Sequence, residues 1–228
     1  FDFNGDLPMA MPITFGVQNA EHEAKDWANS RFLLLLGSNP VETRIPDVHF
    51  VFDALEAGAR LVVVDPTFSP TAAKADSWLQ IKPGTDAALG LALCRQIVAD
   101  GLVDVEFMRT YTDATLLVRA DTGKRIRGRD VDPTAPEVSF VAWDLGRREP
   151  IVVGTERLGF APIDEPALDG TFQVTLGDGS VVEATPGYAL VAAELDQWTP
   201  ERAAELTAVP AERIVAVARA FATTKPAA

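Results

Sequence analysis

Cysteine, positive charge and long apolar runs are all scarce in this chain of 228 residues. The one cysteine, Cys94, rules out an internal disulfide, and we expect it to be buried in a helix among leucines. Lys and Arg number 20 against 33 Asp and Glu, so the net charge is -13 and no nucleic-acid surface is expected. The apolar run of residues 33–36 is far too short to cross a bilayer, so we predict no direct membrane insertion.

Two common nucleotide-binding motifs are also missing. The absence of G-x-G-x-x-G disfavours an ordinary NAD-binding Rossmann site, and the absence of G-x-x-x-x-G-K-[ST] excludes a P-loop ATPase. The composition, 47% hydrophobic and 23% charged, is that of a globular chain that can bury a sizeable core. The chain begins with Phe and stops just after "TTKPAA", so we expect it to be an internal piece of a longer protein.

Apolar runs alternate with capped, helix-like segments in the first half of the chain. Strands are predicted near residues 32–36, 61–64 and 78–81. Helices are predicted to open at Pro46, at Ser69 and at Asp86. Since the strands are apolar on both faces, they indicate a parallel sheet covered by helices. The order predicts an α/β fold, namely a doubly wound, Rossmann-like three-layer unit.

The pattern changes along the chain and predicts four segments. Residues 1–30 are irregular, and residues 31–120 form the Rossmann-like unit. Residues 121–195 form a small β-rich insertion, in which a Gly-Asp-Gly turn joins two strands of a hairpin. Residues 196–228 form a C-terminal helical segment, with helices opening at Thr199 and Pro210.

Polar loops follow all three predicted parallel strands: "GSNPVETR" (37–44), "DPTFS" (65–69) and "KPGTD" (82–86). Ligands of open α/β sheets bind beyond the carboxyl ends of the strands, and helix N-termini attract anions. The three loops therefore suit a nucleotide, with phosphate at the first, ribose at the second and base at the third. Ordinary helix caps would use the same residue types, so a non-catalytic nucleotide-binding module and a protein-interaction domain stay open.

Three stretches carry a resemblance to a known family: "GDLPMAMPITFG", "DWANSRFLLLLGSNPVETRIPDVHF" and "ARLVVVDPTFSPTAAKADSWLQIKPGTDAALGLAL". In this order and separation they resemble the catalytic subunits of molybdopterin-dependent oxidoreductases of the dimethyl sulfoxide reductase superfamily, in the nitrate reductase-like branch. The resemblance is nearly continuous to about residue 120 and weaker to residue 226.

The resemblance implies that the loops hold one guanine dinucleotide of a molybdenum bis(molybdopterin guanine dinucleotide) cofactor. Ser38, Asn39, Glu42 and Thr43 would contact the pterin and pyrophosphate, and Asp65, Thr67 and Ser69 the ribose and guanine side. Asp86 would accept hydrogen bonds from the guanine ring N–H and amino group, since a carboxylate offers two acceptor oxygens. The remaining cofactor-binding candidates are loop residues that shape these contacts: Gly37, Pro66, Gly84 and Thr85.

The N-terminal "FDFNGDLP" resembles the family's D-x-x-x-D-L-P arrangement, in which the first Asp coordinates molybdenum. Here that residue is Asp2, the candidate catalytic residue and metal ligand. A carboxylate suits a hard, oxophilic metal. The family's iron–sulfur cysteines are absent, so such a cluster is expected only in a missing N-terminal part.

The implied function is two-electron transfer of an oxygen atom or hydroxyl. The implied partners are a small-molecule or oxyanion substrate and an iron–sulfur electron-transfer subunit. The resemblance points to a prokaryotic protein, either periplasmic after twin-arginine export or at the cytoplasmic face of the membrane; the sequence does not choose between them.

Overall fold

The computed structural model describes residues 10–17, 23–154 and 165–228, and the chain forms two compact units. The first unit comprises the residues up to Pro83 together with Ala220–Ala228, and the second comprises Gly84–Arg219. The division into segments 1–30, 31–120, 121–195 and 196–228, predicted from the sequence pattern, stays a prediction.

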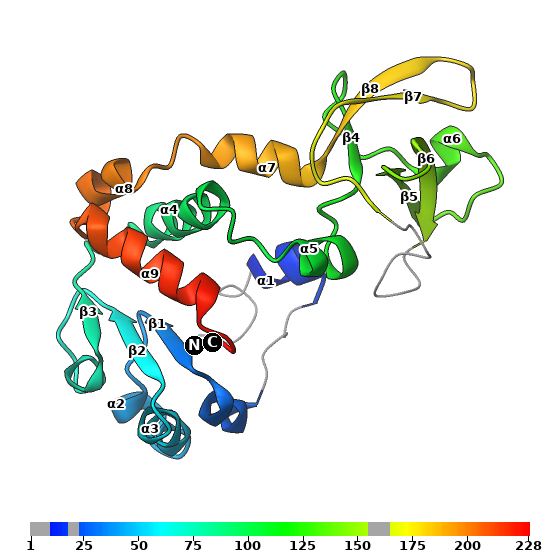
Figure 1. The fold of residues 1–228 in the computed structure, drawn as a ribbon. Coiled ribbons are helices and arrows are strands. Elements are labelled where there is room, and N and C mark those ends of the chain that lie inside the picture. Colours follow the sequence, from blue (N-terminus) through cyan, green and yellow to red (C-terminus); the bar gives the residue numbers. More distant parts are fainter. Residues whose placement is uncertain (1–9, 18–22, 155–164) are drawn as a thin grey trace. The chain divides into compact units, whose positions relative to one another are not determined.

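The first unit contains a sheet of three parallel strands in the order β1-β2-β3 (Figure 1): β1 Phe32–Leu36, β2 Arg60–Val64 and β3 Ser77–Leu79. The predicted parallel α/β sheet is therefore confirmed. The third strand was predicted to extend to Ile81, but it ends at Leu79. Val64 is the last residue of β2 and pairs with Leu79, so residues 80 and 81 have no partner in β2.

Helical segments lie on both faces of this sheet. On one face, α3 (Val48–Glu56) supplies two residues of a buried cluster, whose members are Leu33, Val51, Ala54, Leu61, Val63 and Ala72. On the other face, the ring of Phe32 meets the ring of Phe221 edge-on, with 6.1 Å between the centroids. Phe221 lies in the last turn of α9 (Ala211–Thr223), the part of that helix that belongs to the first unit, so helical residues lie against this face as well.

Four short helical segments complete the first unit: α1 Ala10–Phe15, η2 Ala24–Asn29, α2 Pro40–Thr43 and η3 Ala72–Lys74. The sequence predicted no helix before residue 30, because Pro12 was taken as a breaker. Pro12 instead lies in the first turn of α1, where a backbone N–H has no partner within the helix. The helix expected to open at Ser69 is one 3-10 turn that starts later.

In the second unit the helices predicted to open at Asp86 and Thr199 are confirmed, whereas the helix capped by Asp104 was not predicted. The predicted helix opening at Asp86 is α4 (Asp86–Ala99), which packs against α7 (Gly187–Leu195) and α8 (Pro200–Thr207). Thr199 caps α8 as predicted, because its Oγ1 accepts the N–H of Arg202 at 3.2 Å. Cys94 lies on α4 but is exposed, contrary to the prediction. None of the helices in the described part of the chain has the length and apolar character needed to cross a bilayer.

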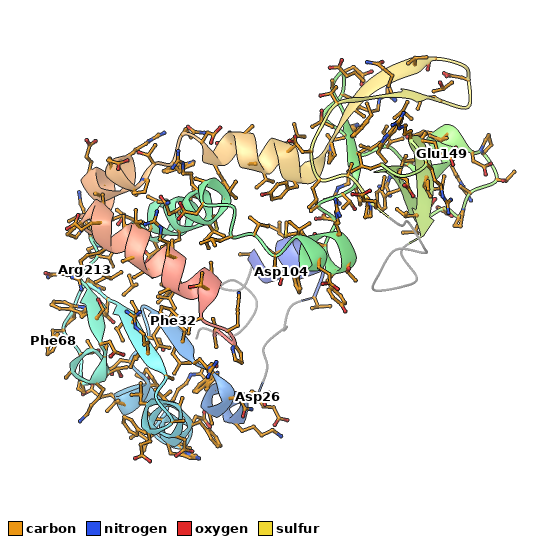
Figure 2. The ribbon with its side chains drawn as sticks, viewed as in Figure 1. Asp26, Phe32, Phe68, Asp104, Glu149 and Arg213 are labelled. Carbon is orange, nitrogen blue, oxygen red and sulfur yellow. The ribbon has the colours of Figure 1, made fainter. Side chains whose placement is uncertain are left out.

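The remainder of the second unit is β-rich. Strands β4 (Leu117–Arg119), β8 (Val181–Pro186) and β7 (Phe172–Thr175) form one antiparallel sheet, and β5 (Ser139–Asp144) pairs with β6 (Glu149–Gly154). The predicted hairpin at Gly-Asp-Gly is β7–β8, confirmed by its antiparallel register. Two helices flank these strands: α5 Val105–Tyr111, capped by the Asp104 carboxylate on the N–H of Phe107 at 2.9 Å (Figure 2), and α6 Gly128–Val131.

Candidate functional site

The end of the chain adds a fourth line of backbone to the parallel sheet, on the free edge of β1. Arg31 N–H donates to the carbonyl of Pro226 at 2.8 Å, Ala228 N–H to Phe32 at 2.9 Å, and Leu34 N–H to Ala228 at 2.7 Å. These bonds and the parallel Phe32–Ala227 bridge make the spatial order β3, β2, β1, residues 226–228. The strand order therefore reverses at β1. Ligands of doubly wound sheets bind beyond the carboxyl ends of the strands at such a reversal.

The first predicted loop begins at this point. Gly37 has a positive φ of 58°, which a residue with a side chain adopts only at a cost, and its N–H donates to Val64 at 2.8 Å. After this turn, the N–H groups of Ser38 and Asn39 and the hydroxyl of Ser38 have no hydrogen-bond partner among the described residues. Free N–H and O–H donors beside a short helix, α2, are the groups that an anion such as a pyrophosphate requires.

The other predicted residues of this loop bond mainly to one another. The Asn39 side-chain amide donates to the Glu42 carboxylate, and the Thr43 hydroxyl donates to the Asn39 carbonyl at 2.9 Å. These bonds fix the shape of the loop. The structure therefore brings Asn39, Glu42 and Thr43 together as a brace next to the free donors of Ser38.

The second predicted loop follows β2. The Asp65 carboxylate accepts the N–H of Thr67 at 2.7 Å through Oδ1, while its Oδ2 has no partner among the described residues. Two side chains hold the loop backbone: Trp78 Nε1 donates to the Asp65 carbonyl at 2.8 Å, and Gln80 Nε2 to the Pro66 carbonyl at 3.4 Å. A carboxylate that is held in place at a strand end and keeps one free oxygen is suited to accept hydrogen bonds from the hydroxyls of a ribose.

Ser69 is buried, and its hydroxyl accepts the N–H of Ala72 at 3.1 Å. In the structure it therefore acts as a cap for η3. A contact from Ser69 to a ligand remains a prediction.

Thr71 is the residue that sequence reasoning missed. It is 1% exposed, its Oγ1 donates to Asn39 Oδ1 at 2.6 Å, and the same oxygen accepts the N–H of Val41 at 3.2 Å. Thr71 thus connects the first loop to the second. The only local signal was a threonine within "SPTAA", which also suits a plain helix start.

Replacing Thr71 by valine should loosen the first loop. The substitution removes a buried hydroxyl and leaves Asn39 Oδ1 and the Val41 N–H unpaired, which costs about 1–3 kcal/mol. We expect hydrogen exchange at Val41 to accelerate roughly 5- to 150-fold in the intact protein, measured by mass spectrometry. Thr175→Val is the matched control, since Thr175 is exposed on β7. An unchanged exchange rate at Val41 would show that the hydrogen bonds of Thr71 to Asn39 and Val41 do not stabilise the loop.

The third predicted loop crosses the unit boundary along the chain: Lys82 and Pro83 belong to the first unit, and Gly84, Thr85 and Asp86 to the second. Gly84 has a positive φ of 79°, Thr85 is the N-cap residue of α4, and Asp86 is exposed in its first turn. A carboxylate at this position stabilises the positive end of a helix whether or not it binds a ligand. The positions of these three residues are defined relative to the other residues of the second unit.

A metal centre is not assembled by the described residues. Asp2 lies outside them, and within them no group of three or more His, Cys, Asp or Glu could hold a metal ion. The metal-ligand role of Asp2 therefore stays a prediction.

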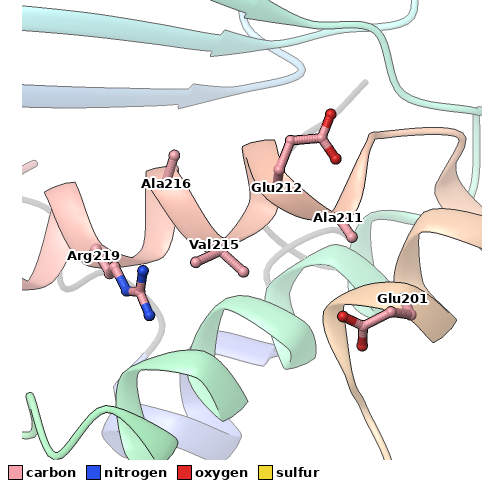
Figure 3. Close-up of a pocket in the computed structure, with 6 residues that line it drawn as sticks. All are labelled: Glu201, Ala211, Glu212, Val215, Ala216 and Arg219. Carbon is pink, nitrogen blue, oxygen red and sulfur yellow. The ribbon is translucent and has the colours of Figure 1, made fainter.

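A hollow of about 550 Å³ lies along the N-terminal part of α9, beside α8 (Figure 3). Its described lining combines apolar Val215 and Ala216 with the charged Glu201, Glu212 and Arg219. Arg219 donates to both oxygens of Asp100 at 2.7 and 3.2 Å, and this bond lowers the pKa of Asp100 to about 2. Among the described residues that line it, none is a Ser, Thr, Cys, His or Lys that could act as a nucleophile.

The comparisons with known proteins decide which family this arrangement represents. The family model "Molybdopterin oxidoreductase" matches residues 1–212. The chain belongs to this family. The molybdopterin oxidoreductase family implies a molybdenum–pterin cofactor, and the donor set at the end of β1 fits an anionic group.

Relatives of this molybdopterin oxidoreductase chain include alpha subunits of reductases. It is 34% identical to perchlorate reductase subunit alpha of Dechloromonas aromatica (strain RCB), over 99% of the chain and 27% of that protein. It is 36% identical to respiratory nitrate reductase subunit alpha of Haloferax mediterranei, over 97% of the chain and 24% of that protein. The chain thus spans about a quarter of the length of these relatives.

A solved structure supports the fold. Acetylene hydratase from Pelobacter acetylenicus superimposes with a TM-score of 0.51 over 89% of the chain and 18% of that protein, at 21% sequence identity. At this identity the likeness concerns the fold alone.

Proposed function

We propose that this chain binds one guanine dinucleotide of a molybdenum bis(molybdopterin guanine dinucleotide) cofactor, within an enzyme that transfers an oxygen atom or hydroxyl with two electrons. The observation that carries the proposal is the Gly37 turn at the strand-order reversal, followed by the unpartnered donors of Ser38 and Asn39. When bound, the cofactor would supply the redox chemistry, and the protein would bind and orient it.

Each loop contributes a different contact in this proposal. The hydroxyl of Ser38 and the N–H groups of residues 38 and 39 donate to the pyrophosphate, while the brace of Asn39, Glu42 and Thr43 keeps these donors in place. Asp65 accepts from ribose hydroxyls through its free oxygen, and Thr67 holds the other oxygen. Asp86 accepts from guanine, and Asp2 is the metal ligand.

The substrate and partner parts of the proposal rest on the relatives' names. These names describe alpha subunits of perchlorate and nitrate reductases and of a dimethylsulfide dehydrogenase from Rhodovulum sulfidophilum, 31% identical over 98% of this chain. We propose an oxyanion or small-molecule substrate and an iron–sulfur electron-transfer subunit as partner.

Cofactor content tests the proposal directly. In the intact protein that contains this chain, we expect molybdenum by mass spectrometry and two guanine nucleotides per molybdenum after acid release. The alternative, a non-catalytic nucleotide-binding module, predicts bound nucleotide without molybdenum. A single guanine per metal, or adenine in its place, would contradict the proposed cofactor.

A further inference from the structure

A strongly basic stretch interrupts this acidic chain. Five of its 20 Lys and Arg residues lie within residues 119–129, although the net charge of the whole chain is -13. The stretch belongs to the β-rich part of the second unit, and no role in cofactor binding is assigned to it above.

The backbone directs two of these cations to the same surface. Residues 125–127 are extended, since Arg125 bridges to Val118 and Arg127 bridges to Phe140. The residue between them, Ile126, is completely buried. Because side chains alternate along extended chain, Arg125 and Arg127 both project from the opposite, outer face. Their guanidinium carbons lie 6.0 and 4.6 Å from the centre of the Phe140 ring.

These side chains line a pocket of about 440 Å³ together with Arg119 and Lys124. Two of these cations already pair with carboxylates of residues outside the pocket lining. Asp121 accepts from Arg119 in a bidentate pair at 2.9 and 2.6 Å, which raises the pKa of Arg119, and Asp113 accepts from Arg125. The Arg119–Asp121 pair shows that a guanidinium at this surface holds a carboxylate in fork-like geometry.

Two further cations remain available. Within the described ranges, neither the Lys124 ammonium nor the Arg127 guanidinium has a carboxylate partner. Asp130, which also lines the pocket, accepts the backbone N–H of Arg127 at 2.9 Å and so serves as a cap for α6. The pocket therefore carries unneutralised positive charge over an aromatic floor.

We propose that this pocket docks an extended, acidic segment of a protein partner. Arg125 and Arg127 stand two residues apart on extended chain, about 6.6–6.8 Å along the strand. Among the described residues Arg125 contacts Asp113 through Nη2 alone, so its guanidinium keeps other N–H donors for a second carboxylate. Carboxylates on alternate residues of a second extended chain have the same spacing, so Asp or Glu at every other position would face successive cations. A compact small anion would reach only part of this row. Because the chain as a whole is acidic, this basic surface is a favourable place for such a segment to approach.

Fluorescence anisotropy of the intact protein with a labelled peptide of alternating Glu and Thr tests this docking. We expect Lys124→Gln combined with Arg127→Gln to weaken binding roughly 2- to 30-fold, because two exposed charge contacts are lost. We also expect the dependence of affinity on salt to become shallower in the variant. Lys74→Gln combined with Arg148→Gln is the matched control, since it removes one exposed Lys and one exposed Arg elsewhere.

Three outcomes would overturn the proposal. The first is equal affinity of wild type and the Lys124/Arg127 variant for the acidic peptide, or equal binding of a Gln-Thr peptide. The second is competition by free succinate at the same concentration as the peptide, which would indicate a small-anion site. The third is self-association of the protein that only the Lys124/Arg127 variant loses, which would place a second copy in the pocket.

Discussion

Replacing Asp2 by alanine in the intact enzyme should lower turnover by more than about 100-fold while most of the guanine dinucleotide stays bound. The reason is that the substitution removes the proposed oxygen ligand of the metal, whereas the proposed dinucleotide contacts lie in other loops. Turnover, molybdenum content, released guanine and the molybdenum resonance spectrum are measured on the same preparation. The spectrum should change, and Asp2→Ser should change it differently.

A control substitution at another aspartate separates the loss of the proposed metal ligand from a general loss of negative charge. Asp26 is exposed on η2 and has no role in the proposed site (Figure 2), so Asp26→Ala should leave turnover and spectrum unchanged. An Asp2→Ala enzyme with normal turnover and an unaltered spectrum would exclude Asp2 as a ligand. The dinucleotide-binding proposal for Ser38 and Asp65 would survive that result, because it depends on separate loops.

Replacing Asp86 by alanine should reduce retention of guanine dinucleotide roughly 5- to 150-fold. Guanine presents two adjacent donors, and leaving a buried donor unpaired costs about 1–3 kcal/mol. Asp86→Asn should also lose most of the guanine, since an amide offers only one acceptor oxygen. The measurement is guanine released per chain, together with molybdenum content.

The competing explanation is that Asp86 only stabilises the N-terminus of α4 through its charge. In that case its replacement lowers stability but does not change guanine content. Glu106 occupies the first turn of α5 in the same way, so Glu106→Ala measures the value of a helix-terminus carboxylate alone, about 0.3–1 kcal/mol of stability. If Asp86→Ala lowers stability to the same extent as Glu106→Ala and leaves guanine content intact, Asp86 is only a structural residue.

Local signals in the sequence were enough for the parallel strands, the hairpin and the helices that open at Asp86 and Thr199, but α5 was missed although Asp104 caps it. A continuous apolar run such as Leu33–Leu36 is typical of a strand covered on both faces, although Leu36 at its end is exposed, and Gly-Asp-Gly restricts the chain to a tight turn. Thr199 caps its helix through a hydrogen bond to a residue three positions later. In each case the deciding interactions lie within one short window of chain. By contrast, α7 was missed because Gly187–Leu195 is apolar on most sides and opens without a polar cap.

The sequence alone also placed the polar loops at the strand ends, but only the tertiary structure assigned different tasks to their residues. It placed residues 226–228 beside β1, so that the strand order reverses at Gly37. It joined Thr71 to Asn39 across 32 positions of sequence, and it turned the hydroxyl of Ser69 toward Ala72. A hydrogen bond between distant segments depends on which backbones meet when the apolar faces are buried, and no window of local sequence contains that information. Residue types therefore predicted where a ligand would bind, while the long-range contacts determined which donors in those loops have no partner among the described residues.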